Sequence, residues 1–289
     1  MKIYILGITG MLGSELFVNF IENKNFIVKG STRKSSLKVY GKYKRNIDYN
    51  VSINDIEKIK KNILRFRPDY VINCIGTIKQ KIGIIKNYNK IFYTNSVFPY
   101  KIYSIIKSTN IKLIHFSTDC VFNGAKGNYR EQDNLSAHDI YGLSKYLGEL
   151  KYPNTYTIRT SIIGHELSSK FGLLEWFLSK KKCYGYNNFF FSGLTTFQVY
   201  NFINNHLLNH KNNYFYGLIH LSSYKISKYK LLKIISKIYN KKILIKKKYI
   251  TKIDRSLNNS LVKKVFLYKP PTWNKMVKQM YLNKYSKLI

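Results

Sequence analysis

The fold is decided at the N-terminus by the stretch Lys2-Ile-Tyr-Ile-Leu-Gly7-Ile-Thr-Gly10-Met-Leu-Gly13. A buried strand over residues 3–6 runs into a G-x-x-G-x-x-G turn, and a helix is expected over residues 11–23. Glycines permit the tight turn and let the backbone approach a pyrophosphate, to which the helix N-terminus offers N–H donors. This order of strand, turn and helix predicts a dinucleotide site. Its residues are Gly7, Thr9, Gly10, Met11, Leu12 and Gly13.

The first half of the chain repeats the alternation of strand and helix. Further strands are expected over residues 26–30, 45–49, 70–74, 112–117 and 155–159, and helices over 54–66, 95–108 and 138–150. This rhythm predicts an α/β fold, a doubly wound parallel sheet with helices on both faces. A dinucleotide-binding domain is therefore expected over residues 1–163.

The alternation loosens after about residue 160. Helices are expected there over residues 171–180, 196–208 and 227–239, and strands over 214–221 and 242–246. We expect residues 164–289 to form mainly a smaller substrate-binding region, with some elements returning to the first domain.

The end of the second strand bears on the choice between NADH and NADPH. An acidic residue there would bind the ribose 2′-hydroxyl of NADH. The segment instead reads Gly30-Ser-Thr-Arg33-Lys34 and has no acid. Arg33 and Lys34 suit a 2′-phosphate, so NADPH is favoured over NADH. The missing acid is the stronger argument, because basic residues are common throughout this chain.

A Tyr-x-x-x-Lys pair, Tyr141 and Lys145, lies in the expected helix over residues 138–150. On a helix this spacing places both side chains on one face. The ammonium would lower the pKa of the phenol, and Tyr141 could then donate a proton to a carbonyl that is being reduced. Thr118 ends a predicted strand, where active-site groups of such sheets gather. In a chain with 26 tyrosines, a Tyr-x-x-x-Lys pair can easily arise by chance. The position of Thr118 is a third element that supports a catalytic site.

Composition excludes several classes of protein. The chain has 50 Lys and Arg against 14 Asp and Glu, a net charge of +36. This charge would suit binding to a nucleic acid or to an anionic membrane. The lysines are spread evenly along the chain, however, so codon bias is favoured as the explanation of the charge. No specific nucleic acid partner is therefore expected. Three cysteines without paired spacing argue against disulfides and zinc. The sequence shows neither an apolar run long enough to span a membrane nor a signal peptide. We therefore expect a cytoplasmic protein that does not associate with a membrane.

Several motifs appear in the order of a known family. They are Gly7-x-x-Gly-x-x-Gly13, Pro68-Asp-Tyr-Val-Ile-Asn-Cys74, Ser117-Thr-Asp-Cys-Val-Phe122, Tyr141-Gly-Leu-Ser-Lys145 with Gly148-Glu149, and Ile158-Arg-Thr-Ser161. Together they resemble the dTDP-4-dehydrorhamnose reductase family, an extended branch of the short-chain dehydrogenases/reductases with the Rossmann fold. The resemblance continues more loosely through Ser192-Gly-Leu-Thr195 and Asp254-Arg-Ser-Leu257 to Pro270-Pro-Thr-Trp273.

The resemblance implies NAD(P)H-dependent reduction of the C4 ketone of a nucleotide-linked 6-deoxy sugar, for surface polysaccharide. It assigns the catalytic roles to Thr118, Tyr141 and Lys145. It adds Cys74, Ile75, Gly76, Asn95 and Ser117 to the cofactor-binding residues. The substrate-binding residues that it implies are Asp119, Val121, Phe122, His165 and Glu166.

Two of these assignments have alternatives. The carboxylate of Asp119 could bind sugar hydroxyls, or it could cap a turn. His165 and Glu166 stand where the family often has an aromatic residue, and a polar loop pair is favoured over substrate contact. His206 and His210 have a spacing that can bind metal, but solvent-exposed histidines are favoured, so no metal site is expected.

Other functions remain open on the same fold. An NAD-dependent sugar epimerase or dehydratase is the first alternative, although Cys120 stands where a dehydratase would place an acid. A non-catalytic, nucleotide-binding regulatory subunit is the second, and the intact set of Thr118, Tyr141 and Lys145 argues against it. A homodimer is also left open.

Overall fold

The structure is a computed structural model of the 289-residue chain, and it describes all residues except 83–86, 168–169, 210–214 and 287–289. Its centre is a seven-stranded sheet in the order β11-β6-β5-β4-β1-β2-β3, and every pairing is parallel. The strands are β1 (Lys2–Leu6), β2 (Ile27–Ser31), β3 (Ile47–Asp48), β4 (Tyr70–Asn73), β5 (Lys112–Thr118), β6 (Thr155–Thr160) and β11 (Gly217–His220). The predicted doubly wound sheet is confirmed.

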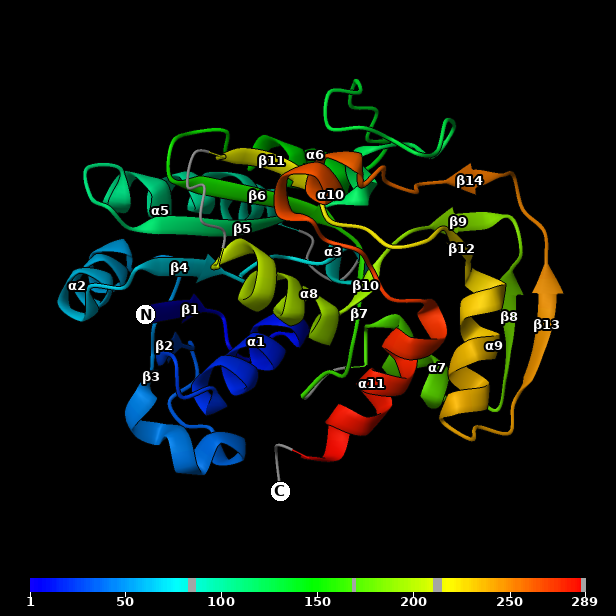
Figure 1. The fold of residues 1–289 in the computed structure, drawn as a ribbon, viewed down its shortest axis with the longest axis horizontal. Coiled ribbons are helices and arrows are strands. Elements are labelled where there is room, and N and C mark those ends of the chain that lie inside the picture. The colour runs from blue at the N-terminus through cyan, green and yellow to red at the C-terminus, as the bar shows by residue number, and fades with distance from the viewer. Residues whose placement is uncertain (83–86, 168–169, 210–214, 287–289) are drawn as a thin grey trace.

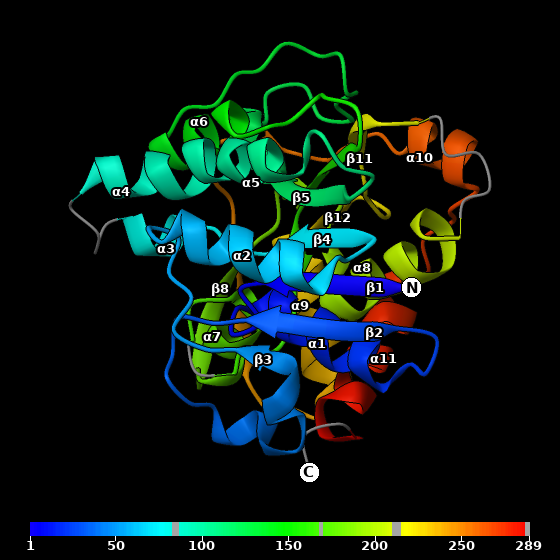
Figure 2. The same ribbon diagram turned by 90° about the vertical axis from the view of Figure 1, so that its left-hand side faces the viewer.

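Helices cover both faces of this sheet (Figures 1 and 2). One face carries α1 (Met11–Glu22), α8 (Thr196–Phe202) and α11 (Trp273–Ser286), and the other carries α2 (Ile56–Phe66), α5 (Phe98–Ile106) and α6 (Ile140–Leu147). Alternate residues of a strand point to opposite faces, so Ile3 and Ile5 belong to one core and Tyr4 and Leu6 to the other. The sheet order reverses between β1 and β4, where doubly wound sheets bind ligands at the strand carboxyl ends.

Helix α2 shows how local sequence sets the helix ends. Asp55 is its N-cap, and its carboxylate accepts a hydrogen bond from the backbone N–H of Lys58 at 3.0 Å. Arg67 ends the helix in the left-handed conformation, and Pro68 follows, which cannot continue the hydrogen bonding of a helix. The observed helix begins two residues later than the sequence predicts.

The smaller part of the molecule lies to the right of the sheet in Figure 1 and contains short strands around α9 (Lys228–Ile238). The parallel pair β8 (Lys182–Tyr186) and β13 (Leu244–Lys248) packs against this helix. A three-stranded sheet has the order β12-β9-β14. Its strands are β12 (Ile226–Ser227), β9 (Phe189–Phe191) and β14 (Ile253–Asp254), and a further pair joins β7 (Ile162–Ile163) to β10 (Leu194–Thr195). β7 follows β6 almost directly and links the two parts of the molecule.

Several elements differ from the sequence-based expectation. The helix expected from residue 95 begins earlier, as α4 (Tyr88–Phe92), and continues through a π-helical turn, η2 (Tyr93–Val97), into α5. The expected helix over 196–208 is α8 followed by the π-helical η4 (Ile203–Leu207). The expected strand over 214–221 is seen as β11, and residue 214 lies outside the described residues.

Some elements had no expectation in the sequence. They are the helices α3 (Lys79–Ile82) and α10 (Ser260–Phe266) and the 3₁₀ segments η1 (Lys38–Asn46) and η3 (Asp119–Val121), besides α11, β8 and the strands of two or three residues after β6. Helix α7 (Leu173–Leu178) falls within the expected range 171–180. Among the described residues, no helix combines the length and the apolar character that crossing a membrane would require.

Candidate active site

The glycine-rich turn lies between β1 and α1 and fits a pyrophosphate. Gly7 has a φ of +83°, a conformation that L side chains rarely adopt. A Cβ on Gly7 would lie 2.7 Å from Cγ1 of Ile75, and a Cβ on Gly13 would collide with the carbonyl oxygen of Gly7. Side chains at these two positions would therefore fill or distort the cradle.

The N-terminus of α1 faces this cradle. Gly10 is the N-cap residue and has no side chain to bond the first amides of the helix, those of Met11, Leu12 and Gly13. The loop after β4 closes the other side, because a Cβ on Gly13 would lie 3.2 Å from Cβ of Cys74. The predicted cofactor residues 7–13 and 74–76 thus meet at the reversal point of the sheet.

Asp48 is an acid beside the end of β2 that the sequence did not reveal. It pairs with Ser31, the last residue of β2, across the β2–β3 ladder. Its carboxylate accepts a hydrogen bond from the hydroxyl of Tyr4 at 2.7 Å and lies 3.7 Å from Nζ of Lys29 and 3.6 Å from a guanidinium nitrogen of Arg65. Asp48 is therefore already engaged by three neighbouring side chains.

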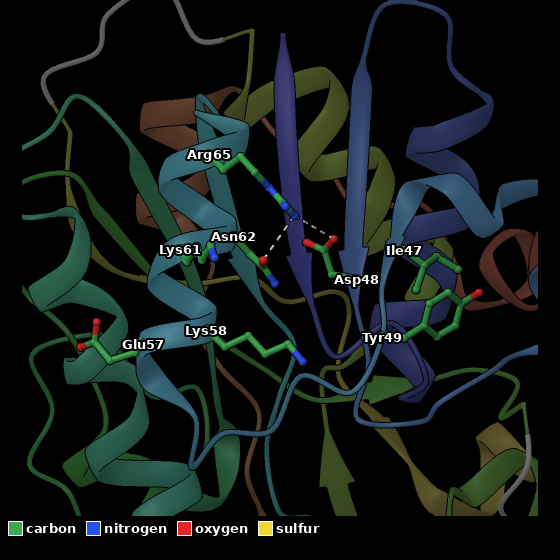
Figure 3. A pocket seen from close by; sticks show the side chains of 8 residues that line it. All are labelled: Ile47, Asp48, Tyr49, Glu57, Lys58, Lys61, Asn62 and Arg65. Carbon is green, nitrogen blue, oxygen red and sulfur yellow. Dashed lines mark hydrogen bonds and ion pairs between the residues drawn. The ribbon is translucent and has the colours of Figure 1, made fainter.

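The pocket shown in Figure 3 is an open groove of about 690 Å³ between β3 and α2. Its walls are Ile47, Asp48, Tyr49, Glu57, Lys58, Lys61, Asn62 and Arg65. It contains none of the predicted catalytic or cofactor residues, so it is separate from the candidate active site. Arg33 and Lys34, the bases predicted to favour NADPH, are exposed on the segment after β2.

The three predicted catalytic residues come together at the carboxyl end of β5. Thr118 is the last residue of that strand, and Tyr141 and Lys145 lie on α6. Asp139 caps α6 by accepting a hydrogen bond from the N–H of Gly142 at 2.8 Å. A Cβ on Gly142 would collide with the carbonyl oxygen of Cys120, so this glycine lets α6 pack closely against the strand end.

The hydroxyl of Thr118 is positioned by its neighbours. It accepts a hydrogen bond from the N–H of Cys120 at 3.1 Å and donates one to Oδ1 of Asp119 at 3.2 Å. Burial raises the pKa of Tyr141, and Cys120 and Asp119 add to this, while a hydrogen bond with Thr118 opposes it. The expected lowering of the Tyr141 pKa by Lys145 is not seen: burial raises this pKa, and Lys145 is not among the main groups that act on the phenol.

Lys145 is buried against the loop after β4. A Cβ on Gly76 would lie 3.7 Å from its Nζ. Burial lowers the pKa of Lys145 to about 8, although the charge of Glu149 acts in the opposite direction. Lys145 is thus placed where the cradle residues and α6 meet, and it remains protonated at neutral pH.

Asn95 lies in the π-helical turn η2 and holds the loop after β4. Its Oδ1 accepts from the N–H of Thr77 at 2.8 Å, and its Nδ2 donates to the carbonyl of Thr77 and to Oγ of Ser144. Asn95 therefore connects that loop to the helix that carries Tyr141 and Lys145.

A buried ion pair lies next to the predicted site residue Ser117, and the sequence analysis did not predict this pair. Nε and Nη2 of Arg159 each donate to one carboxylate oxygen of Glu149 at 2.7 Å, and both side chains are 1 % exposed. The hydroxyl of Ser117 donates to Glu149 at 2.6 Å, and Nη1 of Arg159 lies 3.2 Å from Nε2 of His220. Ser117 thus faces this pair, which ties β5, β6 and β11 to the end of α6.

The predicted substrate residues divide into two groups. Asp119 is buried beside Thr118, while Val121 and Phe122 are fully buried and pack with Tyr129 and Leu257. Burial raises the pKa of Asp119, and the charges of two cations of the smaller part that the sequence analysis missed, Lys228 and Arg255, oppose this rise. Arg255 stands in a motif that the sequence displays, whereas Lys228 could not be distinguished among so many lysines.

His165 and Glu166 are engaged with neighbouring residues in the loop after β7. His165 lies 2.7 Å from a carboxylate oxygen of Glu175 and 2.8 Å from the hydroxyl of Tyr239. Glu166 accepts a hydrogen bond from the N–H of Gly172 at 2.7 Å. These contacts agree with the polar loop pair that the sequence favoured.

Of the two histidines with a spacing that can bind metal, the structure describes only His206. His206, expected to be solvent-exposed, is only partly exposed, and its Nδ1 lies 2.9 Å from the carbonyl oxygen of Phe266. His210 lies outside the described residues. Among the residues that the structure describes, no cluster of three or more His, Cys, Asp or Glu could hold a metal ion.

The chain is similar to curated proteins of glycan biosynthesis over part of their length. It is 31% identical over 173 residues to the spore coat polysaccharide biosynthesis protein SpsK of Bacillus subtilis, which covers 57% of this chain and 54% of that protein. It is 29% identical over 153 residues to a probable low-salt glycan biosynthesis reductase, Agl14, of Haloferax volcanii, which covers 52% and 48%. The match therefore spans about half the length of each relative.

The fold has a close counterpart among solved structures, and a family profile matches the sequence. The dTDP-4-dehydrorhamnose reductase of Bacillus anthracis, crystallised in complex with NADP, superimposes with a TM-score of 0.77 at 18% identity, over 98% of this chain and 99% of that one. The profile of the RmlD substrate binding domain matches residues 1–181. This chain belongs to that family, the dTDP-4-dehydrorhamnose reductase family, as its motifs indicated.

Proposed function

We propose that this protein reduces the C4 ketone of a nucleotide-linked 4-keto-6-deoxy sugar with NADPH, in the synthesis of a surface polysaccharide. The observation that carries the proposal is the convergence of Thr118, Tyr141 and Lys145 beside the glycine cradle at one edge of the sheet. The relatives named for polysaccharide and glycan biosynthesis support the pathway class.

The cradle supports the choice of a nicotinamide cofactor. Gly7 and Gly13 leave room for a pyrophosphate, and the first amides of α1 point toward it. When bound, the dihydronicotinamide would supply the hydride for the ketone carbon. The exposed Arg33 and the engagement of Asp48 by three other side chains favour a 2′-phosphate, and the NADP complex of the Bacillus anthracis enzyme agrees with this.

The side chains of this chain would handle the proton. Tyr141 is assigned as the donor to the ketone oxygen, because its hydroxyl lies beside Thr118 at the strand end. Thr118 would orient the same oxygen by hydrogen bonding. Lys145 would place its positive charge beside Gly76 in the loop after β4, where it would position the cofactor.

The test is a substrate panel read by NADPH absorbance at 340 nm. Purified protein is mixed with NADPH or NADH and with dTDP-, UDP- and GDP-linked 4-keto-6-deoxy sugars. We expect stoichiometric oxidation of NADPH with at least one of them, and faster turnover than with NADH. Absence of oxidation across the panel, together with protein that purifies with bound NAD, would instead support the epimerase or dehydratase reading.

A further inference from the structure

The described residues of the loop after β7 pack on the first turns of α1, the helix that begins at the glycine cradle. Gly172 touches the side chain of Met11, because a Cβ on Gly172 would lie 2.6 Å from Cε of that residue. A Cβ on Gly164 would collide with the hydroxyl oxygen of Thr196, and that hydroxyl donates to Oε2 of Glu15 at 3.1 Å. Met11 and Glu15 are four residues apart and lie on one face of α1. The loop therefore borders the end of α1 that adjoins the cradle.

Glu166 fixes the contact between this loop and α1. Its Oε2 accepts a hydrogen bond from the backbone N–H of Gly172 at 2.7 Å. A side chain at position 172 would disturb the arrangement, because a Cβ there would lie 3.2 Å from the same oxygen of Glu166 and closer still to Met11. The acid, the glycine and the methionine thus form one packed unit, in which Glu166 determines where Gly172 lies.

His165 anchors the start of the loop to two other helices. Its Nδ1 lies 2.7 Å from Oε1 of Glu175 on α7, and its Nε2 lies 2.8 Å from the hydroxyl of Tyr239, the C-cap residue of α9. With a partner at each ring nitrogen, the imidazole has one preferred orientation. The backbone of Glu166, the next residue, is held in place with it.

These contacts bear on the cofactor side of the site. Met11 is the first residue of α1, and the N–H groups of this first turn have no acceptor within the helix. They are the donors that the cradle would offer to a pyrophosphate. Groups that are held in place before a ligand arrives lower the entropic cost of binding it. A loop packed against Met11 is therefore expected to increase the affinity of the cradle.

We propose that Glu166 is a positioning residue for the cofactor, which holds Gly172 on Met11 and thereby increases the affinity of the cradle for NADPH. The inference rests on the proposed function in one respect, namely that the cradle takes a nicotinamide dinucleotide. It adds a residue that lies outside the glycine motif. It also assigns Glu166 to the cofactor, whereas the resemblance assigned it to the substrate.

The experiment measures NADPH binding by fluorescence titration, so it does not depend on turnover. Glu166→Ala removes the acceptor, and we expect the dissociation constant to rise about tenfold, the size of effect that one hydrogen bond to a charged group can have. Glu166→Gln should stay within about threefold of the wild type, because its amide oxygen can still accept from the N–H of Gly172. Loss of packing alone would not produce this recovery.

A double-mutant cycle tests the route through Met11. Met11→Ala removes the side chain on which Gly172 rests. Adding Glu166→Ala to it should therefore weaken NADPH binding by less than about twofold more, because residues that act through one contact are not additive. Glu57→Ala is the matched control, since this glutamate is exposed at the start of α2, and its dissociation constant should change by less than about twofold.

Three results would overturn the proposal. They are wild-type affinity in Glu166→Ala, an equal loss of affinity in Glu166→Gln and Glu166→Ala, and additive effects of Met11→Ala and Glu166→Ala. If Glu166→Ala does not fold, Tyr239→Phe decides, because it removes only the hydroxyl that His165 contacts. It should raise the dissociation constant for NADPH about threefold, and an unchanged value would count against the proposal in the same way.

Failure of the proposed function would look different. NADPH binding that depends on Glu166, without oxidation of NADPH by any keto-sugar, would uphold this inference and reject the reductase. Reduction of a keto-sugar with an unchanged KM for NADPH in Glu166→Ala would do the reverse.

Discussion

The two regions of this molecule are built in different ways. Residues 1–163 contribute six strands to one continuous parallel sheet, and the predicted catalytic residues lie at its carboxyl edge. The later residues form β11 of that sheet and otherwise strands of two to five residues in small separate sheets. The comparison shows that the residues predicted to carry the chemistry lie on the regular region, whereas the residues after 163 mostly form short strands and helices beside it.

The largest expected effect tests where the chemistry resides. Tyr141→Phe removes the proton donor but keeps the ring, so turnover should fall by about a thousandfold, within the range of general acid catalysis. Binding of NADPH, followed by fluorescence titration, should stay within about twofold, because the cradle is unchanged. A variant that retains a tenth or more of the wild-type rate would contradict the assignment of Tyr141.

The second prediction compares one ion pair from each region. Glu149→Gln leaves Arg159 buried without a counter-charge, and the free energy of unfolding should drop by about 3–5 kcal/mol. Lys225→Gln breaks the pair with Asp254, in which the lysine side chain is 54 % exposed, and should cost less than about 1 kcal/mol. Urea denaturation measures both, and equal losses would refute the difference between the regions.

The third prediction concerns the glycine cradle. Gly13→Ala forces a Cβ against the carbonyl oxygen of Gly7, which should destabilise the protein by about 1–3 kcal/mol and weaken NADPH binding at least tenfold. Gly41→Ala is the control, because a Cβ there has no heavy atom within 4 Å. Thermal melting with and without NADPH measures both variants. Tight NADPH binding by Gly13→Ala would show that the cofactor lies elsewhere.

The smallest expected effect is a pH dependence. Burial lowers the pKa of Lys145 to about 8, so the ammonium is present below that pH and is lost above it. Because kcat/KM reports the free enzyme, it should decline above about pH 8 and be roughly tenfold lower at pH 9. A profile that stays flat to pH 10 would mean that the charge of Lys145 is not needed.

The first region follows its sequence pattern closely because its elements are specified by short-range signals. Strand runs, helix caps and the glycine turn each act within a few residues, so β1, α1 and α2 lie within two residues of their expected ends. The small strands β9, β12 and β14 had no such signal, because strands of two or three residues exist only through their pairing partners. The buried partners of Glu149 were equally invisible, since its pairing with Arg159 depends on how β6 lies against α6.

The sequence by itself determined the fold class, and it predicted the cofactor cradle and the candidate catalytic residues, because these predictions depend on motifs with fixed local spacing. Only the tertiary structure decided that Asp48 is held by Tyr4 and Arg65, that burial raises the pKa of Tyr141, and that the charges of Lys228 and Arg255 lower the pKa of Asp119 against the effect of burial. The physical reason is the same in each case. Burial and charge balance depend on neighbours that the chain brings together over long distances, and no local pattern records them.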